Sequence, residues 1–180
     1  MRIIGGNAGG RVLYVPQGLP VRPTTDKAKE ALFNHLNHHF NIEGLTVLDL
    51  FSGTGSMALE FASRGAIVEV WEIHPKCLAF ISESAKTLRL EVNTKKCDVF
   101  KSIATRSSKG YDLIFADPPY SDVRLRDLPD HILKNGFLSE DGTFILEHPS
   151  MFSFLSHSNF LEARKYGQSM FSFFTNESHA

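Results

Sequence analysis

Residues 111–122, YDLIFADPPYSD, place an acid, two prolines and a tyrosine directly after a short apolar run. The prolines remove two N–H donors and fix φ, so a turn through Pro118 and Pro119 is stiff and its carbonyl groups point in set directions. The Asp117 carboxylate and a proline carbonyl can accept both hydrogens of an exocyclic amine on a nucleobase. The ring of Tyr120 offers a face on which a base can stack, worth about 1–3 kcal/mol. This stretch predicts a site for an amine-bearing base, although a plain proline turn has the same composition.

Two glycines lie where another apolar run meets a helical pattern, in DLFSGTGSMALE. Gly53 and Gly55 let the chain turn sharply, and the helix that follows offers free N–H groups to a ligand. The spacing also satisfies a loose G-x-G-x-x-A dinucleotide pattern, with Glu72 about 20 residues further on, where an acid would hold ribose hydroxyls. A purely structural turn and an NAD-dependent oxidoreductase both remain open from this stretch alone.

Apolar runs and helical patterns alternate along the chain, which predicts a parallel sheet with helices on both faces. Strands are predicted at residues 45–51, 66–72, 92–98, 111–116 and 142–149, with a bent or paired strand region at 163–175. Helices are predicted between them at residues 56–65, 75–89, 99–108 and 121–136. The fold class is therefore α/β.

The N-terminal part reads differently, because residues 1–20 are rich in glycine and alternate only weakly. We expect a small β-hairpin there, ahead of one main domain over residues 21–180. The segment TTDKAKEALFNHLNHHF predicts an amphipathic helix that is capped by Thr24 or Thr25. Its inward face is predicted to hold Ala28, Leu32, His35 or Leu36, and His39.

The net charge is −1, so the overall composition does not indicate a nucleic-acid partner. Basic residues nevertheless gather before Glu30, opposed there only by Asp26: Arg2, Arg11, Arg22, Lys27 and Lys29. A patch that faces phosphates is one interpretation of this segment, and a solvated surface is the other.

The two cysteines, Cys77 and Cys97, are far apart and in no metal-binding spacing, which favours a reduced intracellular protein. The N-terminus has no apolar core of a signal peptide, and no apolar run could span a membrane. We therefore expect a cytoplasmic protein. His35, His38 and His39 share a helical patch but have no nearby cysteine or HExxH pattern, so no metal site is expected.

Three stretches together resemble a known family. Asp49 precedes Gly53 by four residues, and Asp-x-x-x-Gly-x-Gly resembles the first motif of the S-adenosylmethionine-dependent methyltransferases. Asp-Pro-Pro-Tyr resembles the fourth motif of the amino-methyltransferases, where Asp rather than Asn points to guanine N2. With RIIGGNAGGRVL and RPTTDKAKEALFN in front, the chain resembles the RsmD family, guanine-N2 methyltransferases of bacterial small-subunit rRNA, from Arg2 to about Glu147.

That resemblance implies a class I methyltransferase with a Rossmann-like seven-stranded sheet and an N-terminal β-hairpin. It implies S-adenosylmethionine as the cofactor and 16S rRNA as the partner, within a partly or fully assembled 30S subunit. The cofactor residues would be Asp49, Phe51, Gly53, Gly55, Glu72 and Asp98. Asp117, Pro118 and Tyr120 would hold the guanine, and Arg2, Arg11, Arg22 and Lys27 would contact RNA phosphates.

Three rival functions stay in view. An N6-adenine methyltransferase of DNA or RNA uses the same fold, and the Asp at position 117 argues against it. An NAD-dependent oxidoreductase would have no use for Asp-Pro-Pro-Tyr. A binding module that has lost activity would not need Asp49, Gly53, Gly55 and Asp117 together.

Overall fold

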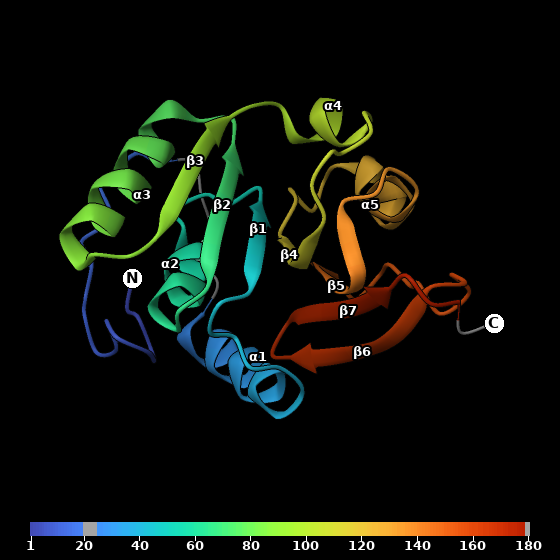
Figure 1. The fold of residues 1–180 in the computed structure, drawn as a ribbon, viewed down its shortest axis with the longest axis horizontal. Coiled ribbons are helices and arrows are strands. Elements are labelled where there is room, and N and C mark those ends of the chain that lie inside the picture. The colour runs from blue at the N-terminus through green and yellow to red at the C-terminus, as the bar shows by residue number, and fades with distance from the viewer. Residues whose placement is uncertain (20–24, 179–180) are drawn as a thin grey trace.

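One seven-stranded sheet organises the chain in the computed structural model, which describes residues 1–19 and 25–178 (Figure 1). The strand order is β3-β2-β1-β4-β5-β7-β6. The strands are β1 (Thr46–Leu50), β2 (Ile67–Glu72), β3 (Val92–Lys96), β4 (Tyr111–Ala116), β5 (Leu138–Pro149), β6 (Phe160–Tyr166) and β7 (Ser169–Thr175). Strands β1 to β5 run parallel, and β7 lies antiparallel between β5 and β6. This is the predicted α/β, Rossmann-like sheet of a class I methyltransferase, and the predicted paired strand region is the β6–β7 hairpin.

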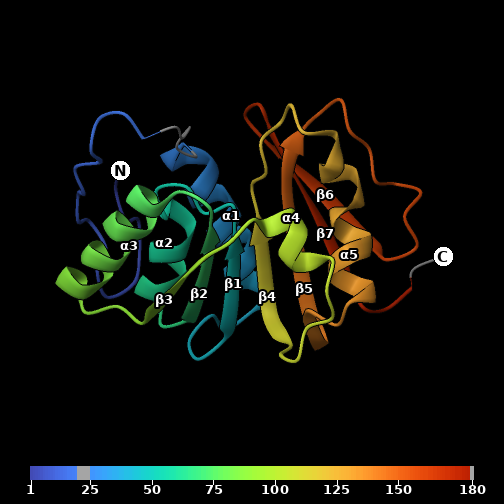
Figure 2. The same cartoon turned by 90° about the horizontal axis from the view of Figure 1, so that it is seen from above.

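Helices cover both faces of the sheet, as the continuous apolar runs of its strands predict. They are α1 (Asp26–His39), α2 (Ser56–Ser63), α3 (Pro75–Leu88), α4 (Val99–Ile103), the 3₁₀ helix η1 (Val123–Asp127) and α5 (Leu128–Lys134). Figure 2 shows α2 and α3 beside β1 to β3, and α4 and α5 beside β4 and β5. Neighbouring residues of one strand serve different cores, since Val47 packs on the α1–α3 side and Leu48 on the α4–α5 side.

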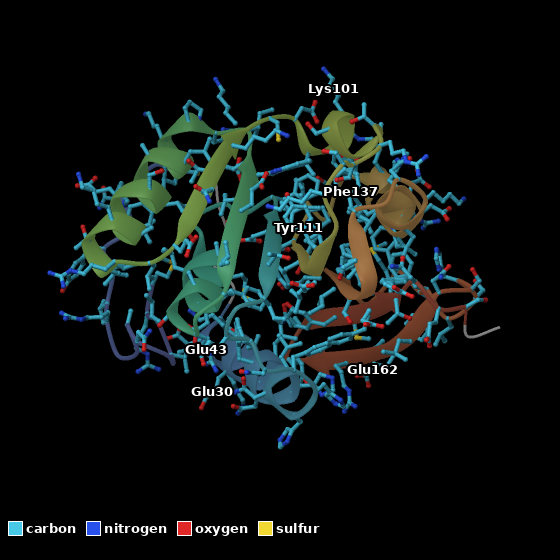
Figure 3. The ribbon with its side chains drawn as sticks, viewed as in Figure 1. Glu30, Glu43, Lys101, Tyr111, Phe137 and Glu162 are labelled. Atoms are coloured by element: carbon cyan, nitrogen blue, oxygen red, sulfur yellow. The ribbon has the colours of Figure 1, made fainter. Side chains whose placement is uncertain are left out.

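The side chains separate into a buried interior and a charged rim (Figure 3). Tyr111 and Phe137 are almost completely buried, at 3% and 2% exposure. Glu30 and Lys101 extend from the outer faces of α1 and α4. In residues 1–19 and 25–178, no helix has both the length and the apolar character needed to cross a lipid bilayer.

Helix α1 begins as predicted, and the predicted inward residues Ala28, Leu32 and Leu36 are buried. The Thr25 hydroxyl accepts a hydrogen bond from the backbone N–H of Ala28 at 3.2 Å and so caps the helix. The buried residues are Ala28, Lys29, Leu32, Phe33 and Leu36. The predicted inward position of His39 is wrong, because His39 is exposed and Phe33 fills the core against Phe61.

The N-terminal segment is a closed loop rather than a regular two-stranded hairpin. A single antiparallel bridge joins Arg2 to Val12, extended by hydrogen bonds from Leu13 N to Met1 O at 2.8 Å and from Ile3 N to Arg11 O at 2.9 Å. Ile3 is buried, and Figure 1 shows the loop beside α2. Ile3 and Ala8 of the loop form a small hydrophobic cluster with Leu59 of α2 and Ala85 of α3, so the loop covers one side of α2.

A buried carboxylate on α2 fixes this loop. Glu60 accepts hydrogen bonds from the backbone N–H groups of Ile4 and Gly5 at 2.7 and 2.9 Å, and Arg64 pairs with it at 2.8 Å. The ammonium of Lys29 lies 3.5 Å from the same carboxylate and donates to the carbonyl of Arg2 at 2.5 Å. Both interpretations of the basic segment, a phosphate-facing patch and a solvated surface, are therefore wrong for Lys29. This lysine is completely buried, and that burial lowers its pKa.

Candidate active site

A cavity of about 510 Å³ opens at the carboxyl ends of the central strands, the usual ligand site of an open α/β sheet. Four strands each deliver an acid to its wall: Asp49 from β1, Glu72 from β2, Asp117 just after β4 and Glu147 from β5. The mouth also includes Thr25, His74, Ser121 and Ser169. The cavity thus joins the glycine loop to the Asp-Pro-Pro-Tyr turn, as the strand order predicts.

The Asp49 side chain forms its hydrogen bonds within the turn between β1 and α2. One carboxylate oxygen accepts hydrogen bonds from the Ser52 hydroxyl at 2.5 Å and from the backbone N–H of Ala58 at 3.1 Å. Burial raises the pKa of Asp49 to about 7, and the nearby Glu72 carboxylate acts in the same direction. This acid therefore shapes the loop that lines the cavity.

Glu72 connects two loops at the end of β2. Its carboxylate accepts the backbone N–H of Gly53 at 2.9 Å and those of Ile73 and His74 at 2.8 and 2.9 Å. An ionised carboxylate has about four acceptor positions, so a ligand hydroxyl can still bind to it. Glu72 is 5% exposed and lies in the cavity wall, where the sequence predicts a ribose acceptor.

Of the other residues of the predicted cofactor loop, some line the cavity and one packs against a neighbouring helix. Phe51 lines the cavity with a positive φ of 58°, rare for a residue with a side chain. Gly53 also lines it, whereas Gly55 does not. A Cβ on Gly55 would lie 2.6 Å from Ile81, so this glycine lets α2 pack closely against α3. Sequence spacing did not distinguish these two glycine roles.

Asp98 lies at the start of α4 and is not among the residues that line the cavity. Its side chain caps the helix by accepting the backbone N–H of Lys101 at 3.4 Å. The nearest link to the cavity is the contact of Phe100 with Phe51, whose ring centroids are 4.9 Å apart. A role for Asp98 in binding the cofactor stays a prediction.

The Asp-Pro-Pro-Tyr turn enters the cavity as a rigid unit. Asp117 continues β4, with its backbone N–H 3.4 Å from the carbonyl of Leu50 on β1. The carbonyl of Pro119 accepts from the N–H of Asp122 at 2.9 Å, which closes the turn. The Pro118 carbonyl is therefore the better match to the predicted second acceptor of an amine.

Glu147, the acid near the end of β5, also lines the cavity but was not predicted as a site residue. It is buried at 3% exposure and accepts a hydrogen bond from the Tyr120 hydroxyl at 3.0 Å. Burial and the carboxylates of Glu147 and Asp117 raise the pKa of Tyr120 well above its usual range. The signal was in the sequence, because GTFILEHP places an acid at the end of an apolar run, as YDLIFAD does.

The predicted RNA residues lie around the N-terminal loop and α1. Arg11 and Lys27 are exposed, and the Arg2 guanidinium pairs with Asp26 at 3.3 Å. Arg22 lies outside the described residues. Thr25 connects this region to the cavity, since it both caps α1 and lines the cavity mouth.

The two cysteines and His35 lie outside the cavity. Cys77 is buried, Cys97 is half-buried, and burial raises the pKa of both thiols. His35 contacts Glu162 of β6 at 2.7 Å. Among the described residues, no three histidines, cysteines or acids form a group that could hold a metal ion.

Comparison with known proteins agrees with this geometry. The family described as conserved hypothetical protein 95 matches residues 1–175. The ribosomal RNA small subunit methyltransferase D of Escherichia coli K12 is 30% identical over 148 residues, covering 82% of this chain and 74% of that protein. A solved hypothetical protein of Thermus thermophilus superposes with a TM-score of 0.84 at 27% identity, covering 97% and 99% of the two chains.

A more distant structure shows the fold alone. Coclaurine N-methyltransferase, solved with S-adenosylhomocysteine (SAH) and N-methylheliamine, aligns with 80% of this chain and 41% of its own at 24% identity and a TM-score of 0.51. The family match and the similarity to the methyltransferase D of E. coli agree with the sequence resemblance. The chain therefore belongs to the RsmD family of methyltransferases, the family described as conserved hypothetical protein 95.

Proposed function

We propose that this protein methylates the exocyclic N2 amine of a guanine in 16S rRNA, with S-adenosylmethionine as the methyl donor. The observation that carries the proposal is that Asp117, Pro118 and Tyr120 share one cavity with Glu72 and the glycine loop. The name of the E. coli relative, a ribosomal RNA small subunit methyltransferase, supports the substrate class.

The donor half of the cavity fits S-adenosylmethionine. The whole cavity has a volume of about 510 Å³, which is in the range of small-molecule sites. The Glu72 carboxylate can accept a ribose hydroxyl, and the backbone at Gly53 is close enough to the cavity to contact the amino-acid part of the cofactor. A distant fold neighbour was solved with SAH, which supports an S-adenosyl cofactor for this fold. When bound, the cofactor supplies an electrophilic methyl group on a sulfonium.

The acceptor half fits an amine on a flat base. The lone pair of such an amine is delocalised into the ring, so the amine is a weak nucleophile. Asp117 and the Pro118 carbonyl accept its two hydrogens and turn the lone pair toward the donor half, while the Tyr120 ring stacks on the base. The two acids beside Tyr120, Asp117 and Glu147, also stabilise the positive charge that develops on the amine during transfer. The base must leave any stack to enter this cavity.

RNA contact is proposed for the exposed cations of the N-terminal loop and α1. Arg2, Arg11 and Lys27 would bind phosphates, which makes RNA affinity decrease as salt increases. The chain carries nearly equal numbers of basic and acidic residues, 19 and 20. The chain's balanced charge gives little attraction for naked rRNA, which favours a partly or fully assembled 30S subunit as the substrate. A ribosomal substrate is consistent with a location in the cytoplasm.

Transfer of a labelled methyl group tests the proposal directly. Tritium from S-adenosylmethionine is followed into 30S subunits that lack this modification, and the digested rRNA is analysed for modified nucleosides. The expected product is N2-methylguanosine. Label in N6-methyladenosine would replace the proposal with its closest rival, and absence of label with intact cofactor binding would remove 16S rRNA as the substrate.

A further inference from the structure

We propose that Glu147 selects guanine by accepting the hydrogen on guanine N1, next to the amine held by Asp117. This assignment rests on the proposed function and adds the feature of the base that the site recognises. Guanine presents two adjacent donors, N1–H and the N2 amine. Adenine presents its N6 amine beside N1, which carries a lone pair and no hydrogen. A pair of adjacent acceptors would therefore accept guanine and repel adenine.

The sheet register places the two acids at the same level. Ala116 of β4 pairs with Leu146 of β5 in parallel register, so Asp117 and Glu147, the next residues on each chain, lie side by side. Neighbouring strands are about 4.8 Å apart, so the two acid side chains can both reach the edge of one base. Both acids line the same cavity.

Tyr120 fixes the carboxylate of Glu147. Its hydroxyl donates to Oε1 at 3.0 Å, and the glutamate is 3% exposed. A carboxylate can accept about four hydrogen bonds, so it can bond Tyr120 and a ligand donor at the same time. The same tyrosine that stacks on the base therefore orients the acid that reads its edge.

The magnitude of this selection can be large. A buried group that is built to bond a substrate N–H or O–H discriminates against an analogue without that hydrogen by up to about 10⁴–10⁵-fold. Hydrophobic contacts to a purine of similar shape discriminate much less. Glu147 is thus a stronger source of base selectivity than the ring of Tyr120, which can stack on any base.

Two guanosine analogues separate the roles of the two acids. The methylated guanosine is first mapped, and 30S subunits are reconstituted with 16S rRNA that carries either 2-aminopurine or inosine at that position. 2-Aminopurine keeps the N2 amine but has no N1 hydrogen, whereas inosine keeps N1–H but has no amine. Wild-type enzyme should methylate the 2-aminopurine subunits at least about 100-fold more slowly than guanosine subunits. Inosine subunits should compete well, although they accept no methyl group.

Glu147→Gln provides the sharper comparison. Glutamine has the same size and can accept from Tyr120 through its oxygen while its amide N–H donates to the lone pair on N1 of 2-aminopurine. The preference for guanosine over 2-aminopurine should fall at least about tenfold. Glu140→Gln, the same substitution at an exposed position of β5, should keep the wild-type preference.

Each outcome decides the assignment. Equal methylation of guanosine and 2-aminopurine by the wild-type enzyme would overturn it, whatever the stability of the variants. A folded Glu147→Gln enzyme with an unchanged preference would overturn it as well and leave Glu147 as a support for Tyr120. Wild-type enzyme that transfers no methyl group to guanosine subunits would instead reject the proposed function itself.

Discussion

Glu72 at the end of β2 accepts the backbone N–H of Gly53 at 2.9 Å, so the acid expected to bind the ribose also holds the glycine loop in place. Two more backbone N–H groups, those of Ile73 and His74, donate to the other oxygen of the same carboxylate. Loop shape and cofactor affinity therefore depend on one side chain.

Glu72→Ala should weaken S-adenosylmethionine binding by about 1.5–3 kcal/mol, the range for a hydrogen bond to a charged group. It should also lower the melting temperature of the cofactor-free protein, because three N–H groups lose their acceptor. Each kcal/mol corresponds to roughly 2–4 °C for a chain of this size. Calorimetry and thermal melting measure the two effects, with the exposed Glu83→Ala on α3 as the control. Unchanged cofactor affinity would remove Glu72 from the binding site.

Lys29 and Lys27 occupy one helix but should respond differently to substitution. Lys29→Met removes the buried partner of Glu60 and should destabilise the protein by about 3–5 kcal/mol. Lys27→Ala removes an exposed cation, and should leave the melting temperature unchanged while it weakens RNA binding at low salt. Equal melting temperatures for Lys29→Met and the wild type would show that the buried pair does not hold the N-terminal loop.

Asp49 makes stability depend on pH in a definite direction. Burial raises its pKa from 3.8 to about 7, so between these values the folded chain binds a proton that the unfolded chain does not. The contribution of Asp49 to stability is thus largest at low pH and is lost as pH rises toward 7. Asp49→Asn cannot titrate, so the melting temperature of the wild type relative to this variant should fall between pH 4 and 7. A difference that stays constant over that range would contradict the raised pKa.

Tyr120 should act mainly through its ring. Tyr120→Ala removes the stacking face and should abolish most methyl transfer, whereas Tyr120→Phe keeps the face and should retain much of the activity. The phenylalanine variant should still lose some stability, because buried Glu147 loses its hydroxyl donor. Single-turnover rates of both variants on 30S subunits give the comparison. If phenylalanine is as inactive as alanine, the hydroxyl and its contact with Glu147 carry the function.

Local sequence patterns predicted much of this molecule because the relevant constraints are local. Apolar runs identified β1, β2 and β4. The spacing Asp-x-x-x-Gly-x-Gly identified Asp49, and the acids that follow the other two runs are Glu72 and Asp117. The alternation of runs and helical patterns then predicted the parallel order that brings those strand ends together.

The features that were missed depend on contacts distant in sequence. Lys29 is buried because Glu60, on another helix, lies beneath it, and Gly55 is required by Ile81 of α3. The sequence does place Glu147 at the end of an apolar run, but its contact with Tyr120 depends on β5 lying beside β4. The N-terminal loop forms one bridge instead of strands because much of its backbone bonding goes to Glu60 and α2.

The most direct measurement of the central claim is single-turnover methylation of 30S subunits by Asp117→Ala with saturating cofactor. Asp117 is proposed to accept the amine hydrogen most strongly as the amine turns toward the methyl group, so its loss should reduce the rate about 10²–10³-fold. Cofactor affinity should stay close to that of the wild type, and Asp117→Asn, which keeps an acceptor oxygen, should be milder. A rate for Asp117→Ala near the wild-type value would contradict the claim that this acid holds the reacting amine.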